Sequence, residues 1–210
     1  MVSTARFTQV SVGALHSCAL ADNGDVWCWG SNDYGQVGVN DSLTATYYTP
    51  QQVTGGRVFT EIGAGGWTTC GLSGGSVYCW GRNTEGQAGR GSTANRWILE
   101  PMPALGILGT ARHVTVGTRH ACATNGIDRM YCWGDNNRGQ LGDGTTTPRA
   151  SAVEVFGDTR FVAMTAGLEH TCALRDGGGA YCWGYNASGR LGLGVATNTN
   201  VTAPTQVVTP

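Results

Sequence analysis

The chain has 210 residues, of which 34 are glycine, and it carries a formal net charge of -1 with 13% charged residues. This charge does not provide the basic surface that nucleic acid or anionic lipid requires, so we expect neither as a partner. No apolar run is long enough to span a bilayer, and Met1 to Phe7 lacks the basic and apolar regions of a secretory signal.

One segment occurs four times along the chain. Its first copy, His16 to Gly38, reads HSCALADNGDVWCWGSNDYGQVG, and the others start at Thr68, His120 and His170. The first cysteine of each copy advances by 52, 52 and 50 residues, a period typical of propeller blades. No window carries an apolar stripe at helical spacing. We therefore predict a single all-β repeat domain over 1-210, with repeats at about 4-54, 55-108, 109-157 and 158-210.

Each copy is predicted to contain a β-hairpin. In the first, Phe7 to Gly13 alternates as a half-buried strand does, and the chain continues from Ser17 to Leu20 into a turn at Asp22-Asn23-Gly24. Val26 to Trp29 then runs back. If the turn has three residues with Gly24 in the left-handed conformation, residues whose numbers sum to 46 lie opposite each other.

The cysteines follow this arithmetic in every copy. In the second copy the cysteines are one residue closer, and the two-residue turn Gly74-Gly75 preserves the register. The third and fourth hairpins are centred on Ile127 and Gly177. The facing pairs are Cys18 and Cys28, Cys70 and Cys79, Cys122 and Cys132, and Cys172 and Cys182.

These facing cysteines are predicted to form disulfides. Opposed residues in an antiparallel pair have Cα atoms close enough for a bridge, which would stabilise each hairpin by about 2 to 3 kcal/mol. Reduced core cysteines and a zinc site are the alternatives. The sequence lacks the close Cys-x-x-Cys pairs of structural zinc sites, so we expect no metal.

Other repeated residues are predicted to be framework. The tryptophans at 29, 80, 133 and 183 are expected to pack between blades, and the asparagines at 32, 83, 136 and 186 to satisfy turn amides. His16, His120 and His170 share one position, where three imidazoles on equivalent strands are a known metal-ligand set. A hydrogen bond to the neighbouring blade is the favoured reading.

Four aromatic residues break the repeat and are the candidate binding residues. Tyr47, Tyr48 and Trp97 lie in long variable segments between hairpins, and Trp67 immediately precedes the second copy. Aromatic side chains on variable segments of a rigid scaffold are typical contact anchors, although they can equally cover a blade edge. No catalytic or phosphate-binding motif is present, so we expect neither an enzyme nor a cofactor.

The repeat resembles that of the regulator of chromosome condensation family. The resemblance lies in Gly13-x-x-His16-Ser17-x-Ala19-Leu20, the turn at Gly24, Trp29-Gly30 and Asn32-x-x-Gly35-Gln36-x-Gly38. It implies a β-propeller whose blades are four-stranded antiparallel sheets. Members usually carry seven repeats, about 51° per blade, so four repeats would leave such a ring open. A closed four-bladed ring, assembly of several chains and part of a longer protein remain alternatives, with the last two favoured.

The cysteine pairs resemble those of secreted bacterial versions of the repeat, which implies an extracellular or cell-surface location. The leading functional hypothesis is a non-catalytic scaffold that presents a rigid surface to a protein or glycan partner. The first alternative is a structural subunit that self-associates through its blade edges into an oligomer or filament. A guanine-nucleotide exchange factor, which the resemblance also suggests, is less favoured because the chain is not basic and has four repeats.

Overall fold

The computed structural model describes residues 6–107, 109–157, 160–195 and 199–208, and it contains four sheets of four strands. Blade 1 is made of β1 (Phe7–Val12), β2 (His16–Ala21), β3 (Val26–Ser31) and β4 (Thr46–Gln52). Blade 2 is made of β5 (Glu61–Gly65), β6 (Thr68–Ser73), β7 (Ser76–Arg82) and β8 (Trp97–Pro103). Blade 3 is made of β9 (Ala111–Val116), β10 (His120–Asn125), β11 (Met130–Gly134) and β12 (Arg149–Glu154). Blade 4 is made of β13 (Phe161–Ala166), β14 (His170–Arg175), β15 (Ala180–Tyr185) and β16 (Asn200–Gln206).

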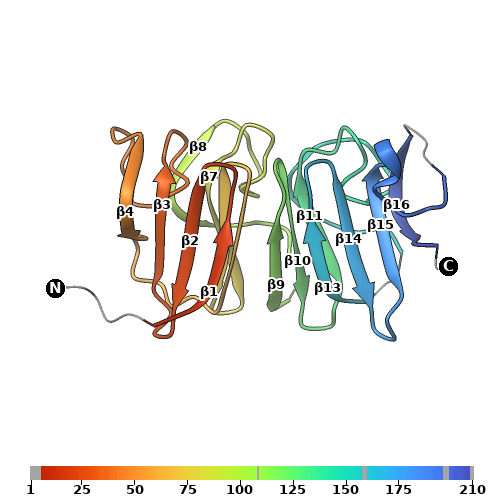
Figure 1. Cartoon of the computed structure of the whole chain (residues 1–210), viewed down its shortest axis with the longest axis horizontal. Helices are drawn as coiled ribbons and strands as arrows, with labels where there is room; N and C mark the ends of the chain where they lie inside the picture. The colour runs from red at the N-terminus through yellow and green to blue at the C-terminus, as the bar shows by residue number, and fades with distance from the viewer. Residues whose placement is uncertain (1–5, 108, 158–159, 196–198, 209–210) are drawn as a thin grey trace.

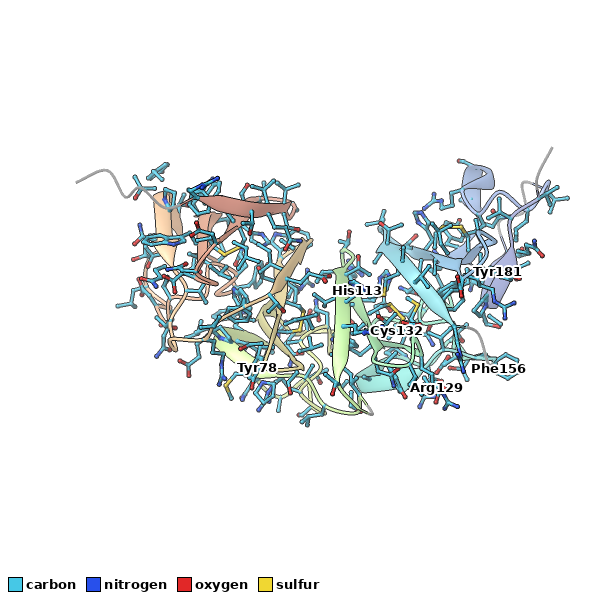
Figure 2. All side chains as sticks on the ribbon, turned by 90° about the horizontal axis from the view of Figure 1, so that it is seen from below. Tyr78, His113, Arg129, Cys132, Phe156 and Tyr181 are labelled. Atoms are coloured by element: carbon cyan, nitrogen blue, oxygen red, sulfur yellow. A yellow bond between two sulfur atoms is a disulfide. The ribbon has the colours of Figure 1, made fainter. Side chains whose placement is uncertain are left out.

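Each blade is an antiparallel sheet in which strands adjacent in sequence are also adjacent in space (Figure 1). This confirms the predicted propeller blades. The four sheets stand side by side in an open arc, with blades 1 and 4 at its two ends (Figure 2). The chain therefore does not adopt the closed four-bladed ring. Within the described residues the only helix is a 3-10 turn at Ala187–Gly189, and none has the length and apolarity to cross a membrane.

The central hairpin of each blade has the predicted register. Gly24 has a φ of 85°, which places it in the left-handed region, and His16 to Leu20 pair with Gly30 to Val26. The cysteines face each other in all four hairpins and form four disulfides with Cα–Cα distances of 4.1 Å. Each bridge joins residues only 9 or 10 apart, so it stabilises one hairpin and does not link blades.

The outer strands begin within the variable segments that separate the hairpins. The first of them, β4, starts at Thr46, so it includes Tyr47, Tyr48 and Pro50. The register between β3 and β4 shifts between Cys28 and Gly30, so Pro50 lies in a bulge of an edge strand. Proline is tolerated there because the ladder does not need its missing N–H group. The outer strands of blades 2 and 4 likewise contain a proline.

Three of the four repeated tryptophans pack between blades as predicted, whereas Trp29 is partly exposed. Trp80, Trp133 and Trp183 are fully buried, and each lies against a glycine of the preceding blade. Gly38 has a φ of 77°, and a Cβ atom there would lie 2.7 Å from Nε1 of Trp80. Only glycine therefore allows both the turn and the close approach of the indole.

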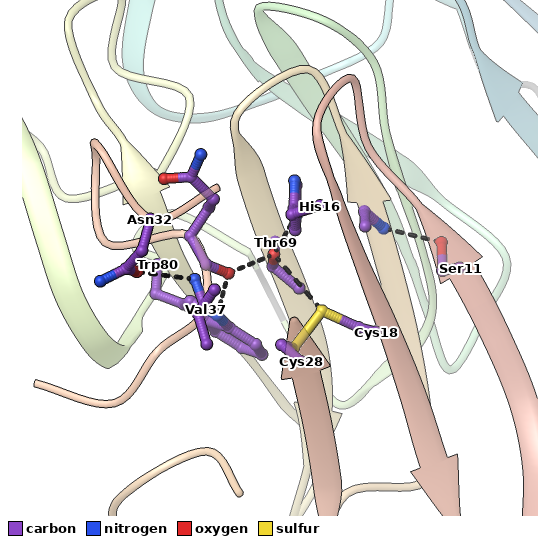
Figure 3. Close-up of a disulfide and its surroundings, with 10 residues drawn as sticks. Ser11, His16, Cys18, Cys28, Asn32, Val37, Thr69 and Trp80 are labelled. Carbon is purple, nitrogen blue, oxygen red and sulfur yellow. Dashed lines mark hydrogen bonds between the residues drawn. A yellow bond between two sulfur atoms is a disulfide. The ribbon is translucent and has the colours of Figure 1, made fainter. Parts of the chain in front are cut away.

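A chain of hydrogen bonds connects blade 1 to blade 2, and we call it the junction relay (Figure 3). The Thr69 hydroxyl donates to the Gln36 carbonyl oxygen at 3.0 Å, and Nε1 of Trp80 donates to the same oxygen at 3.0 Å. Nε2 of His16 lies 2.8 Å from the Thr69 hydroxyl. Because the single hydroxyl hydrogen is used on Gln36, the histidine must donate, so its Nε2 carries a hydrogen. The predicted hydrogen bond to the neighbouring blade is thus confirmed.

The junction relay is repeated between blades 3 and 4 but changes between blades 2 and 3. His120, Thr171 and the Gln140 carbonyl reproduce it, with distances of 2.8 Å at both steps. At the intervening junction the histidine position is Thr68 and the threonine position is Ala121. The loss of the imidazole donor is therefore matched by the loss of its hydroxyl acceptor, and no buried hydroxyl is left at position 121.

The first strands of neighbouring blades are joined through side chains. The Gln9 amide donates to the Ile62 carbonyl at 2.8 Å and accepts from the Ile62 N–H at 2.9 Å. The Ser11 hydroxyl accepts from the Ala64 N–H at 2.8 Å. These bonds satisfy backbone groups on the open edge of β5 that its own sheet does not pair.

The second junction replaces the histidine and the threonine of the junction relay together, which predicts that His16 and Thr69 are energetically coupled at the first junction. Thr69→Ala should lower the free energy of unfolding by about 1 to 3 kcal/mol, because it leaves the buried His16 Nε2–H without an acceptor. When Thr69→Ala is made in a His16→Thr background, it should lower the free energy of unfolding by at least about 0.5 kcal/mol less than it does in the wild type. This double variant reproduces the combination of Thr68 and Ala121 at the second junction. Urea unfolding of the four proteins measures this cycle, and additive effects would contradict the relay.

The buried histidines predict an acid-sensitive fold. Burial lowers the pKa of His16 to about 4 and that of His120 to about 3. Between pH 6.5 and pH 4 the unfolded chain therefore binds protons that the folded chain does not, and stability is lost as the pH falls. For His16 the loss should be on the order of 3 kcal/mol. Urea unfolding from pH 7.5 to 4.5 should show a shallower decline for His16→Gln, and equal declines would refute the assignment.

The disulfides predict a mass change. Reduction adds two hydrogens per bridge, so the four bridges should add eight hydrogens to the intact protein. Mass spectrometry of the denatured, alkylated chain before and after reduction measures this gain. Alkylation of the unreduced protein would show that the cysteines are free thiols.

Candidate binding site: an aromatic and arginine cluster

Two of the four predicted binding residues come together at the junction of blades 1 and 2. Trp67 lies in the turn between β5 and β6, and Trp97 is the first residue of β8. Between them lies Tyr34, from the turn that follows β3. The Tyr34 ring is 6.1 Å from the ring of each tryptophan, in edge-to-face geometry. Such edge-to-face contacts are favourable for aromatic rings.

Arg82, the last residue of β7, completes this group. Its guanidinium lies 5.2 Å from the Trp67 ring centre and 5.5 Å from the Tyr34 ring centre. Nε of Arg82 donates to the Thr84 hydroxyl at 2.8 Å, which orients the guanidinium plane. We call Tyr34, Trp67, Arg82 and Trp97 the aromatic cluster.

The backbone holds the aromatic cluster in place. The Arg82 N–H donates to the Trp67 carbonyl at 2.8 Å, and Arg82 pairs with Trp97 across β7 and β8. Gly81 precedes Arg82 with a φ of 98°, and a Cβ atom there would lie 2.4 Å from the Trp67 carbonyl oxygen. The cluster is thus built on paired strands and a required glycine, so little ordering is needed when a partner binds.

The cluster is accessible. Trp97 is 53% exposed, and Tyr34 and Trp67 are half-buried. The Arg82 side chain is mostly covered, with a Glu85 carboxylate oxygen 4.0 Å from its terminal nitrogen. An exposed indole beside fixed aromatic edges and an arginine provides flat apolar area together with hydrogen-bond donors. Trp, Tyr and Arg are the residue types most enriched at the centres of binding interfaces.

The other two predicted binding residues lie on the outer strand β4 and make no ring contact with the cluster within the described part of the chain. Tyr48 is 92% exposed. The Tyr47 hydroxyl donates to a carboxylate oxygen of Asp41 at 2.6 Å. Burial and this hydrogen bond raise the pKa of Tyr47, and hydrogen bonds from Thr44 and Tyr47 lower the pKa of Asp41. Tyr47 thus helps to hold the loop before β4, whereas Tyr48 remains an isolated exposed ring.

Sequence reasoning missed Tyr34 and Arg82. Tyr34 was assigned to a framework turn, where the Asn32 side chain accepts from the Val37 N–H as predicted. Within that turn its own position varies, and the other copies have Glu85, Arg138 and Ser188 there. An aromatic residue at a variable position of a constant turn is the signal that could have identified it.

Equivalent positions at the third junction carry different chemistry. Nε of Arg138 lies 3.8 Å from a Glu169 carboxylate oxygen, and its guanidinium lies 4.3 Å from the Tyr185 ring centre. The second junction has Glu85 and Arg119 at the corresponding positions. The aromatic character is therefore a property of the first junction and not of the repeat.

Two profiles of the regulator of chromosome condensation (RCC1) repeat match the chain four times each. One matches residues 7–36, 59–87, 111–140 and 161–190, and the other matches 23–72, 74–124, 128–174 and 177–210. The chain is 31% identical over 153 residues to the ultraviolet-B receptor UVR8 of Arabidopsis thaliana, covering 71% of this chain and 34% of that protein. It is 32% identical over 146 residues to the human E3 ubiquitin-protein ligase HERC2, covering 68% of this chain and 3% of that protein.

Solved structures share the blade arrangement. Human WBSCR16 superposes with a TM-score of 0.86 at 23% identity, covering all of this chain and 55% of that one. Prp20p of Saccharomyces cerevisiae superposes with a TM-score of 0.83 at 22% identity, covering all of this chain and 52% of that one. The chain thus spans about half the length of these propellers and a third or less of the two curated relatives. With both profiles matching along its length, the chain belongs to the regulator of chromosome condensation (RCC1) repeat family.

Proposed function

We propose that the chain is a non-catalytic scaffold that binds a protein partner through the aromatic cluster. The observation that carries this proposal is the meeting of Tyr34, Trp67 and Trp97 around Arg82, with Trp97 exposed. A protein is favoured over a glycan because the cluster combines the three side-chain types that dominate protein interfaces. The mechanism is rigid presentation, since the paired strands β7 and β8 hold Arg82 and Trp97, and the Arg82 N–H binds the Trp67 carbonyl before any partner arrives.

The proposed location is outside the cell or on its surface. Four disulfides join eight cysteines, and no cysteine among the described residues is free. Such bridges persist in oxidising compartments and are rare in the reducing cytosol. Partner binding is described for another protein with this fold, since Prp20p of Saccharomyces cerevisiae binds Gsp1p and histones. For this chain those partners are not proposed, because the shared feature is the fold.

Self-association is a second candidate function. It is favoured by one observation. Blade 4 exposes an apolar face, whereas the counterpart side chains on the other blades are buried at the junctions. Exposed contiguous apolar surface typically marks an interaction site.

The cluster predicts which substitution abolishes binding. Peptides are first selected from a random phage-displayed library on the immobilised 210-residue chain. The Trp97→Ala variant should bind these peptides at least about ten-fold more weakly, because truncating an interface anchor typically costs about 2 kcal/mol or more. Tyr48→Ala, which removes a more exposed ring outside the cluster, should change affinity less than about two-fold. Isothermal titration of the selected peptides against each variant measures the difference.

A glycan array probed with the same three proteins separates the two classes of partner. Glycan binding that depends on Trp97, without any peptide binding, would replace the protein partner by a sugar. Binding that is insensitive to Trp97→Ala in both formats would refute the aromatic cluster as the site.

A further inference from the structure

The outward face of blade 4 presents side chains that the other blades bury. Leu174 on β14 is 44% exposed, whereas its counterparts Leu20 and Leu72 are 5% and 3% exposed. Leu174 lines a hollow of about 270 Å³ whose other walls are mostly apolar residues of β13, β14 and the start of β15, together with Thr165. Cys172, unlike its fully buried counterpart Cys18, is only half-buried on this face. This surface is the one that blades 1, 2 and 3 each use to receive the next blade.

The outward face of blade 1 has the opposite half of the same interface. Val10 on β1 is 71% exposed, whereas its counterparts Ile62 and Val114 are 2% and 6% exposed. Trp29 is partly exposed, although Trp80, Trp133 and Trp183 are fully buried. This is the surface that blades 2, 3 and 4 each pack against the preceding blade.

The two faces also carry the two halves of a junction relay. Blade 4 supplies His170 at the histidine position and the Arg190 carbonyl at the position of the Gln36 carbonyl. Blade 1 supplies Ser17 at the position of Thr69, and Trp29 at the position of Trp80. Serine has the same hydroxyl as threonine, so it can accept from His170 and donate to Arg190. Within the described residues, neither the Ser17 hydroxyl nor the Trp29 indole N–H makes a hydrogen bond.

Two further positions fit this arrangement. Gly192 corresponds to Gly38, and a Cβ atom there would meet Val207 and no tryptophan, so the position can receive an indole. Thr165 corresponds to Ser11, whose hydroxyl accepts from the Ala64 N–H of the next blade. The equivalent N–H on blade 1 belongs to Val12, which is 68% exposed.

We propose that blade 4 of one copy of this chain receives blade 1 of a second copy, in the same orientation as the junctions within the chain. The contact is continuous with an interface that the chain already builds three times, and both of its halves are open on the same molecule. This proposal rests on the self-association put forward above and assigns its interface. His170 Nε2 donates to the partner's Ser17, and the partner's Trp29 donates to the Arg190 carbonyl.

Such a contact joins unlike faces. A head-to-tail contact adds copies until the rotation closes a ring or an open chain grows. Two copies together contain eight blades, which is within the range of known propellers. In either case the smallest species is a dimer that buries Val10 of one copy and Leu174 of the other.

The test uses the 210-residue chain and light scattering after size-exclusion chromatography over a range of concentrations. The wild-type chain should associate, and Val10→Asp and Leu174→Asp should each weaken association at least about ten-fold, because each buries an unpaired carboxylate. Leu43→Asp makes the same change at a side chain that is 92% exposed in the loop before β4, and it should associate like the wild type. Near-ultraviolet circular dichroism and the melting temperature show whether each variant keeps its fold.

Mixing the two variants establishes which faces meet. Val10→Asp retains an intact blade 4 face and Leu174→Asp retains an intact blade 1 face, so the mixture should form a heterodimer that neither variant forms alone. Contact between like faces would instead leave one variant dimeric by itself and would overturn the head-to-tail arrangement.

The outcomes also separate this interface from self-association as such. A wild-type chain that stays monomeric at high micromolar concentration would overturn both, and would leave the aromatic cluster untouched. Association that resists both aspartate substitutions would uphold self-association and overturn this interface.

Discussion

The fold depends on the contact between one blade and the next. At each internal junction a single main-chain carbonyl, from Gln36, Gln87 or Gln140, accepts the indole N–H of the following blade's tryptophan at 2.9 or 3.0 Å. The tryptophan is fully buried, so its N–H requires this acceptor, and the adjacent glycine leaves room for the ring. At the first junction this contact acts together with the hydrogen bonds of Gln9 and Ser11 to the edge of the next sheet.

The disulfides and the junctions stabilise different levels of the structure. A disulfide spans 9 or 10 residues and constrains one hairpin, whereas the junction relay joins residues about 50 positions apart. Among the described residues, each blade packs against its sequence neighbours, so stability is approximately a sum of blade terms and junction terms. The blades at the ends of the arc each have one junction instead of two. Their outward faces consequently expose side chains that interior blades bury.

The candidate site uses the same turns as the framework without disturbing them. Asn32 and Gly35 shape a turn that every blade repeats, while Tyr34 between them is free to vary. Next to it, the position of Trp67 is Arg119 or Glu169 in later blades, so each junction presents its own chemistry on one backbone frame. Function can therefore diversify at these positions at little cost to packing, as is common for variable positions on rigid scaffolds.

Local sequence patterns encode the blade, whereas the site and the outward faces depend on how the blades pack together. Facing cysteines, Gly24 and the glycine pair at 74 and 75 define a hairpin through local geometry, which is why the register and the four disulfides could be read from spacing alone. Tyr34 and Trp97 are 63 positions apart and meet only because blade 2 packs against the turn of blade 1, which no local pattern encodes. The start of β4 could not be predicted from the sequence either, because the segment contains a proline. An edge strand can contain a proline where a bulge removes the need for its N–H group. The exposure of Val10 and Leu174 also depends on which blades have neighbours, a property of the assembled arc that identical repeat positions in the sequence cannot express.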